Sequence, residues 1–78
     1  REEAAGGDGR FLYFLGTYHE RGVGMPRDLA AARTCYEKAA AAGEPRAMLR
    51  LAHLYFTGQG VERNEDKARK WRDAAKMN

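Results

Sequence analysis

A chain of 78 residues, with 44% hydrophobic and 32% charged residues, is long enough for one domain with a small core. No run is apolar enough to span a membrane, and residues 1–10 lack the apolar stretch of a signal peptide. The net charge of +3 is mild beside the cationic stripes of nucleic-acid binders, and it fits solubility or an acidic protein partner. The single cysteine, Cys35, excludes an internal disulfide. We expect a soluble chain in an intracellular setting.

The first predicted helix covers residues 8–20, where apolar residues recur at steps of three and four. Gly22 follows this run, at a point where a helix end needs a residue that tolerates positive φ, and Pro26 lies just beyond it. Asp28 then offers a side-chain oxygen for capping, and residues 29–42 are dense in strong helix formers. The pattern predicts a helix, a loop and a second helix.

The second half of the chain repeats this pattern with a period of 36 residues. Gly43-Glu44-Pro45 supplies a turn, residues 44–56 have helical periodicity, Gly58 and Gly60 correspond to Gly22 and Gly24, and residues 65–77 form the last predicted helix. Eleven residues are identical to the residue 36 positions later. A fixed period of this length predicts an all-α superhelix, or α/α solenoid, of two helix-turn-helix repeats.

The period also bears on the ends of the chain. Ala4, Ala5 and Gly7 match residues 40, 41 and 43, so residues 1–7 are interpreted as the tail of a preceding repeat or a linker, residues 8–43 as the first repeat and residues 44–78 as the second. We expect a fragment of a longer array, with neighbouring repeats of the same array as partners. Exposed apolar end faces would then allow self-association.

Several motifs occur in both copies. In the second copy, residues 51–61 read Leu-Ala-His-Leu-Tyr-Phe-Thr-Gly-Gln-Gly-Val and are followed by Asn64, Lys67-Ala68, Trp71 and Ala74-Ala75. The first copy has the corresponding residues Leu15-Gly16, Gly22-Val23-Gly24, Asp28, Ala31-Ala32, Tyr36 and residues 38–43. They closely resemble the Sel-one-like repeat, a relative of the tetratricopeptide repeat, over nearly the whole chain. Met25-Pro26, His19 and Arg72 depart from the pattern. The resemblance implies an α/α solenoid that scaffolds protein complexes, and it implies no catalysis.

A candidate binding groove follows from the faces of the two leading helices. Ala47, Leu51 and Leu54 are expected to face inward, which leaves arginines on the opposite stripe. In stacked helix pairs the first helix of each pair lines the concave surface. We predict that a peptide or partner protein, possibly an acidic one, binds there through Arg10, Phe14, Thr17, Arg46, Arg50 and His53, with Arg21 continuing the stripe. The alternative is that these positions are merely solvated.

A second basic group lies on the last predicted helix, at Lys67, Arg69, Lys70, Arg72 and Lys76 around Trp71. Binding of nucleic acid or of an anionic membrane would use such cations with the indole ring. Acidic neighbours, and the correspondence of Trp71 with Cys35 at an inward position, favour a structural role for the group. We expect no nucleic-acid binding and no membrane insertion.

The sequence offers no catalytic or cofactor chemistry. His19 and His53 lie in different copies without clustered metal ligands, and the Gly-x-Gly loops lack the remainder of a phosphate-binding motif. We therefore expect no catalytic residue, no metal and no cofactor. Two functions stay open: a protein-interaction scaffold that is not itself an enzyme, and a regulatory or substrate-docking module of a larger enzyme.

Overall fold

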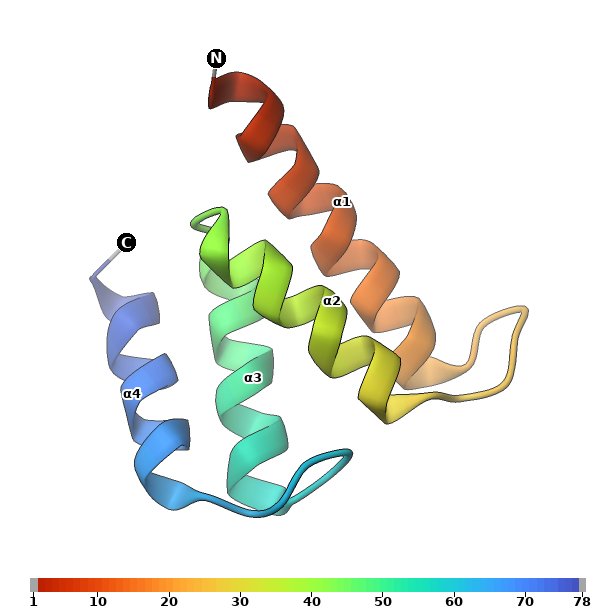
Figure 1. Ribbon diagram of the computed structural model, residues 1–78, viewed down its shortest axis with the longest axis vertical. Helices are drawn as coiled ribbons and strands as arrows, with labels where there is room; N and C mark the ends of the chain where they lie inside the picture. The colour runs from red at the N-terminus through yellow and green to blue at the C-terminus, as the bar shows by residue number, and fades with distance from the viewer. Residues whose placement is uncertain (1, 78) are drawn as a thin grey trace.

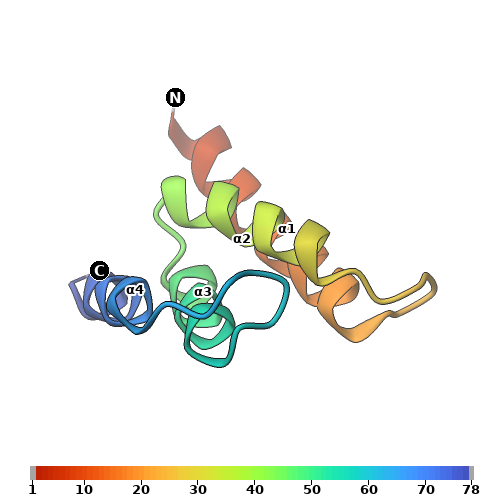
Figure 2. The same cartoon turned by 60° about the horizontal axis from the view of Figure 1, so that its bottom comes forward.

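The computed structural model describes the backbone of residues 2–77 and the side chains of residues 9–77. Its helices are α1 (Glu2–Arg21), α2 (Leu29–Ala41), α3 (Pro45–Thr57) and α4 (Glu65–Lys76), and the described residues contain no strand. α2 packs against both α1 and α3, and α4 packs against the far side of α3, so α1 and α4 are the outer helices (Figures 1 and 2). The predicted all-α fold of helix pairs is confirmed.

The second helix of each pair begins with the same capping interaction. Oδ1 of Asp28 accepts a hydrogen bond from the Ala31 amide at 3.0 Å, and Oδ1 of Asn64 accepts one from the Lys67 amide at 3.0 Å. These side chains satisfy amide groups that have no partner within the helix. The capping role predicted for Asp28 is confirmed, and Asn64 has the same role 36 positions later.

The loops within the two pairs are also alike. Gly22 and Gly58 have φ values of 73° and 74°, in the left-handed region that favours glycine. The end of each loop is hydrogen-bonded to the first helix of its own pair. The Asp28 amide donates to the His19 carbonyl and the Asn64 amide donates to the Tyr55 carbonyl, both at 2.9 Å. The 36-residue period of the sequence therefore corresponds to a period in the structure.

The core lies where α2 and α3 meet. Tyr36, Leu51 and Leu54 are its largest fully buried side chains. Ala32, Ala39 and other small residues surround them, and a methyl side chain allows two helices to approach closely. Cys35 is buried, as its alignment with Trp71 predicted, and Trp71 is half-buried against the core.

The start of α1 differs from the prediction. The apolar pattern placed a helix over residues 8–20, but α1 begins at Glu2 and continues through Gly7, where the second copy has the turn at Gly43. The difference arises from the residue two positions after each of these glycines. Pro45 cannot continue a helix, because it has no amide hydrogen and its ring clashes with the preceding turn, whereas Gly9 at the matching position has neither restriction. The assignment of residues 1–7 to a preceding repeat stays a prediction.

Candidate functional site

A polar network crosses the junction between the two helix pairs. The Arg50 guanidinium on α3 forms an ion pair with the Glu20 carboxylate on α1, and the Tyr36 hydroxyl on α2 donates to Glu20 at 2.7 Å. The side chain of Glu20 is only 10% exposed. A carboxylate in such a place needs its partners, because an unpaired buried charge is costly. The network therefore fixes α3 relative to α1 and α2.

A second contact across this junction uses Arg46. Its Cζ atom lies 4.6 Å from the centre of the Tyr13 ring and 5.4 Å from the centre of the Phe14 ring. Its Nε donates to Oε2 of Glu44 at 2.7 Å. This hydrogen bond lowers the pKa of Glu44, and the charge of Arg10 contributes in the same direction. Arg46 thus acts as a stacked cation beside two aromatic rings.

Beside this network lies a hollow of about 670 Å³ between α1, its following loop and α3. Phe14 and Tyr18 give it an apolar wall and are 48% and 47% exposed. Arginines and other polar groups complete the lining, which consists of Tyr13, Phe14, Thr17, Tyr18, Glu20, Arg21, Arg27 and Arg50. Because its exposed groups are aromatic rings and guanidinium ions, this hollow suits a ligand that is partly apolar and negatively charged.

The structure brings together only part of the predicted groove. Phe14, Thr17 and Arg50 line this hollow, and Arg46 stacks on one of its rings. The Thr17 hydroxyl donates to the Phe14 carbonyl at 2.7 Å, within its own helix. Arg10 is exposed and lines neither this hollow nor the one between α3 and α4.

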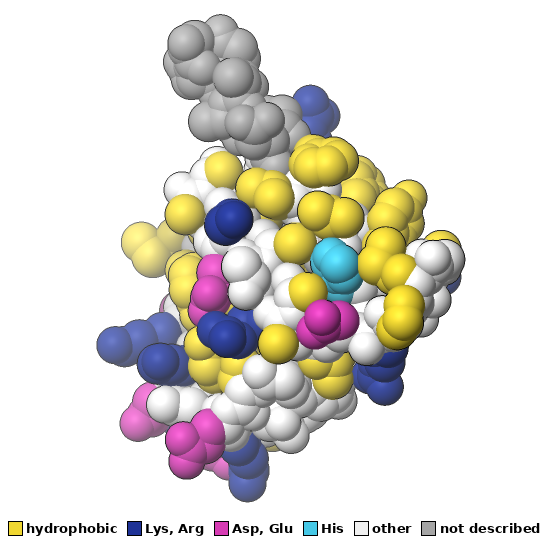
Figure 3. Space-filling model, turned by 45° about the vertical axis from the view of Figure 1, so that its right-hand side comes forward, with side chains coloured by type: hydrophobic (Ala, Val, Ile, Leu, Met, Phe, Trp, Pro, Cys, Tyr) yellow, Lys and Arg dark blue, Asp and Glu magenta, His cyan; other side chains and the backbone are white. Residues whose placement is uncertain are grey.

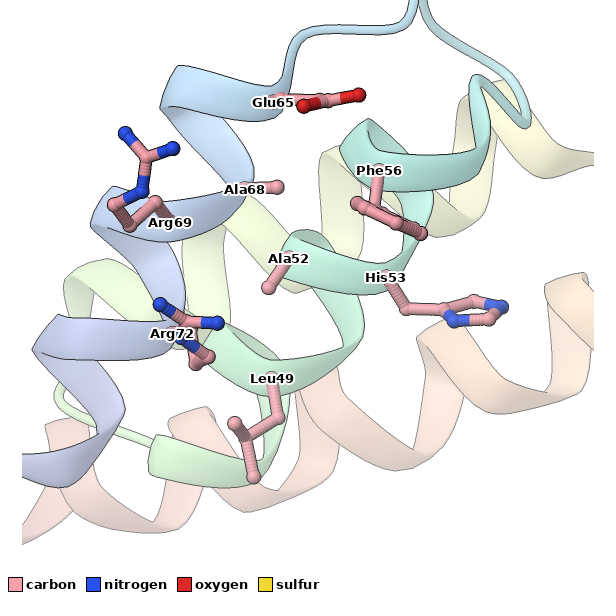
Figure 4. A pocket seen from close by; sticks show the side chains of 8 residues that line it. All are labelled: Leu49, Ala52, His53, Phe56, Glu65, Ala68, Arg69 and Arg72. Carbon is pink, nitrogen blue, oxygen red and sulfur yellow. The ribbon is translucent and has the colours of Figure 1, made fainter.

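His53 belongs to a different surface. It lines a hollow of about 410 Å³ between α3 and α4, together with Leu49, Ala52, Phe56, Glu65, Ala68, Arg69 and Arg72 (Figure 4). In that view the imidazole ring of His53 points away from α4, at the edge of the hollow. The structure therefore separates His53 from the arginines with which it was grouped.

Sequence reasoning left Tyr18 and Arg27 out of the candidate site. Tyr18 was missed because it matches Leu54, a core residue of the second copy, whereas Tyr18 itself is half-exposed. Arg27 lies in a loop, where helical periodicity says nothing about direction. Its Nε donates to the Glu20 carbonyl at 2.9 Å, which holds the side chain at the hollow. In the second repeat Arg63, 36 positions after Arg27, donates in the same way to the Phe56 carbonyl. The 36-residue period is therefore the sequence signal that could have identified the position of Arg27.

The basic group on α4 does not form an uninterrupted cationic surface. Arg69 pairs with Asp66 at 3.4 Å and Arg72 approaches Asp73 at 3.8 Å. Nζ of Lys67 lies 5.3 Å from the centre of the Tyr55 ring. These contacts are those of a surface whose charges are balanced locally.

The described side chains include no group of three His, Cys, Asp or Glu residues that could hold a metal ion. Burial raises the pKa of the Cys35 thiol, which disfavours the reactive thiolate. Within the described residues, none of the helices has the length and apolar character to cross a membrane.

Comparison with known proteins agrees with the two-pair architecture. The profile of the Sel1 repeat matches residues 10–44, within the first helix pair and its following turn, and residues 45–71, within the second helix pair. The chain belongs to the Sel1 repeat family. Sel1 repeats are protein-interaction repeats, so the family indicates binding of another protein.

Two similar proteins are named DAP3-binding cell death enhancer 1, one from Rattus norvegicus and one from Mus musculus. Each is 40% identical to this Sel1-repeat chain over 52 residues, which cover 67% of the chain and 10% of the relative. The chain thus spans about a tenth of the length of these relatives. No solved structure gives a significant match.

Proposed function

We propose that this pair of Sel1 repeats is a protein-interaction scaffold that binds an acidic, partly apolar segment of another protein in the hollow between α1 and α3. The observation that carries the proposal is the lining of that hollow, in which two half-exposed aromatic rings, Phe14 and Tyr18, stand beside guanidinium groups. Apolar side chains of the segment would contact the rings, and its carboxylates would accept hydrogen bonds from the arginines.

The charge of the hollow favours an acidic ligand. Its one carboxylate, Glu20, already accepts hydrogen bonds from Tyr36 and Arg50. Three arginines line the same hollow, and Arg21 among them is exposed on the last turn of α1. A second carboxylate entering the hollow therefore meets excess positive charge, and this attraction weakens as salt is added.

Arg10 and Arg46 would extend this surface along α1 and α3. Arg46 keeps 47% of its side chain exposed while it stacks on Phe14, so it can still donate to a ligand. His53 lies outside this surface, at the hollow between α3 and α4, and the proposal gives it no contact with the ligand. The names of the rat and mouse relatives, which describe binding of another protein, support a scaffold role. A regulatory or substrate-docking role beside an enzyme would use the same hollow, and the proposal assigns the repeats themselves no catalytic step.

Fluorescence anisotropy tests this proposal. A fluorescein-labelled peptide rich in Glu with spaced Leu residues is titrated with the chain at rising NaCl, and a peptide with Lys in place of Glu is the control. We expect Arg21→Gln and Arg46→Gln each to weaken binding of the acidic peptide, because losing one charge-assisted hydrogen bond costs about 1 kcal/mol, roughly fivefold in Kd.

The matched control is Lys70→Gln, which removes one charge at the hollow between α2 and α4 instead. It is expected to leave the affinity unchanged. If the arginine variants and Lys70→Gln bind equally well, or if the Lys-containing peptide binds as tightly as the acidic one, the proposal is wrong.

We also propose that the chain associates with itself through two exposed apolar surfaces, one on α1 and one on α3. Large hydrophobic side chains are exposed on α1, at Phe11, Phe14 and Tyr18, and on α3, at Leu49 and Phe56. Figure 3 shows hydrophobic side chains gathered over the side of the molecule that α1 occupies. Apolar patches of this kind mark interaction sites.

A further inference from the structure

The junction between the two repeats shows how one repeat receives the next. On α3, Ala47, Leu51 and Leu54 are completely buried. The residues 36 positions earlier, on α1, are Phe11, Leu15 and Tyr18, of which Phe11 is 63% and Tyr18 47% exposed. α1 therefore carries, on its outer side, the face that α3 buries within the molecule. We call it the α1 face.

The opposite end carries the receiving face. On α1, Tyr13 and Glu20 hold the arginines that α3 contributes to the junction. Their counterparts 36 positions later are Leu49 and Phe56, which are 49% and 55% exposed and line the hollow of about 410 Å³ between α3 and α4 (Figure 4). We call this hollow the α3–α4 hollow. Nothing within the described residues fills it.

The two faces differ from the internal junction in a coordinated way. Inside the molecule, Arg50 of the arriving helix pairs with Glu20 of the receiving helix. At the outer faces the arriving position is Phe14 and the receiving position is Phe56. Both members of the ion pair are thus replaced by phenylalanine. If one copy packed on the next as α3 packs on α1, these two rings would be in contact, and such a pair of rings is stabilising. A change at the arriving position alone would have left a carboxylate against a ring.

A second pair of positions changes in step. Inside the molecule, the Tyr55 hydroxyl of the arriving helix lies 3.4 Å from Oε2 of Glu37. The corresponding positions are His19, on α1, and Asp73, on α4. An imidazole and a carboxylate form a hydrogen-bonded pair as readily as a phenol and a carboxylate do.

The sizes of the side chains also match. In the first repeat the ring of Tyr36 fills the space over Gly16. In the second repeat Arg72 stands at the position of Tyr36, and the space is open. The arriving side chains are correspondingly larger, because Phe11 replaces Ala47 and Tyr18 replaces Leu54. The Arg72 guanidinium would lie near the ring of Phe14, where a cation–π contact is favourable.

We propose that two copies of this chain associate head to tail, with the α1 face of one copy in the α3–α4 hollow of the next and Phe14 against Phe56. This inference rests on the proposed self-association and specifies its faces and register. The contact uses a different surface on each partner, so it is heterologous and continues into open chains instead of closing as a symmetric dimer. Its occupant is a second copy, because the two faces repeat an interface that the chain already forms within itself.

Sedimentation equilibrium over a range of concentrations tests the proposal. The wild-type chain should show an average mass that rises beyond that of a dimer as concentration increases. Phe14→Ala and Phe56→Glu should each weaken the association more than about tenfold, because the first removes one of the two contacting rings and the second places a carboxylate against the other. Both side chains are about half exposed, so both variants should keep the wild-type circular dichroism spectrum.

Mixing the two variants gives the decisive measurement. In an equimolar mixture the intact α1 face of Phe56→Glu fits the intact hollow of Phe14→Ala, while the remaining two faces have lost both phenylalanine rings and join much more weakly. The mixture should therefore form one-to-one dimers that do not grow. A mixture that stays monomeric, a wild-type chain that is monomeric at every concentration, or a wild-type chain that stops at a dimer would overturn the proposal.

The matched control is Val23→Glu, which changes an apolar residue that is 47% exposed on the loop after α1 and should associate like the wild type. Phe14 belongs to both proposed surfaces, whereas Phe56 belongs only to the α3–α4 hollow. Phe56→Glu therefore tests the head-to-tail contact without changing the peptide site. Phe56→Glu should weaken association and leave binding of the acidic peptide unchanged, whereas Arg21→Gln should weaken binding of the peptide and leave association unchanged. Failure of the peptide site and failure of the head-to-tail contact therefore give different results.

Discussion

The ring of Tyr36 lies directly against Gly16. A Cβ atom placed on Gly16 would stand 2.6 Å from Cε1 of Tyr36, closer than such atoms approach in proteins. Tyr36 is completely buried and its hydroxyl is fixed by Glu20, so the ring cannot move aside. Gly16 therefore allows α2 to place a large aromatic side chain against α1.

Gly16→Ala should destabilise the chain. Overpacking costs about 1–3 kcal/mol, and the better helix propensity of Ala returns about 1 kcal/mol, so we expect a net loss of roughly 1 kcal/mol. Thermal denaturation followed by circular dichroism would show a Tm lower by about 4–8 °C. Gly9→Ala is the control, because a Cβ atom on Gly9 would have as its closest neighbour Cβ of Ala42 at 3.2 Å, a longer distance than that between a Cβ on Gly16 and the Tyr36 ring. Equal Tm values for the two variants would contradict the packing described.

Tyr36 should also make stability depend on alkaline pH. Burial raises the pKa of its hydroxyl well above the usual range, and the hydrogen bond to Glu20 raises it further. In the unfolded chain a tyrosine loses its proton near pH 10, whereas the folded chain retains it. The contribution of this proton is therefore complete below about pH 10 and decreases as the pH rises further. Urea denaturation between pH 8 and 11 should show a steeper loss of stability for the wild type than for Tyr36→Phe, and parallel curves would exclude this role.

The sequence predicted the fold well because its signals were local and occurred twice. The left-handed glycine at Gly58, the cap at Asn64 and the helix start at Pro45 depend on neighbouring residues alone. α1 was predicted too short because the prediction followed the apolar pattern, which begins at residue 8. The helix itself begins at Glu2, since Gly9 stands where the second repeat has the helix-breaking Pro45. Local signals thus identified the helices and loops of both repeats.

The candidate site was less predictable, because it depends on pairs of side chains from different helices. Helical spacing placed Arg50 and His53 on one stripe, but Arg50 reaches across to Glu20 while His53 lies at the α3–α4 hollow. Spacing along one helix gives the direction of a side chain, and it does not give the partner. The half-exposed Tyr18 was missed in the same way, since its counterpart Leu54 is a core residue.

Gly60→Ala should cost more stability than Gly24→Ala, although both glycines have φ near 70°. The shared strain of a left-handed alanine is about 1 kcal/mol in each variant. At Gly60 the added methyl would also lie 2.9 Å from the backbone carbonyl group of Leu29, while at Gly24 it would meet nothing. Backbone cannot yield as a flexible side chain does, so we expect a further loss of roughly 1–2 kcal/mol at Gly60. Urea denaturation of both variants measures the difference, and equal losses would show that this loop does not rest on α2.

The ion pair between Arg50 and Glu20 should stabilise the chain more than the exposed pair between Arg63 and Glu65. Glu20 is buried and also holds Tyr36, so Arg50→Gln leaves a buried carboxylate short of one partner, at a cost of about 1–3 kcal/mol. Arg63 and Glu65 are both more than half exposed, and such pairs contribute about 0–1 kcal/mol.

Double-mutant cycles with Glu20→Gln and with Glu65→Gln, measured by urea denaturation, isolate the two coupling energies. A coupling at Arg50 no larger than that at Arg63 would mean that this pair does not hold the two repeats together. Because Arg50 has this structural role, reversing its charge would disturb the junction as well as the hollow. For that reason Arg21 and Arg46 are the better positions at which to measure ligand binding.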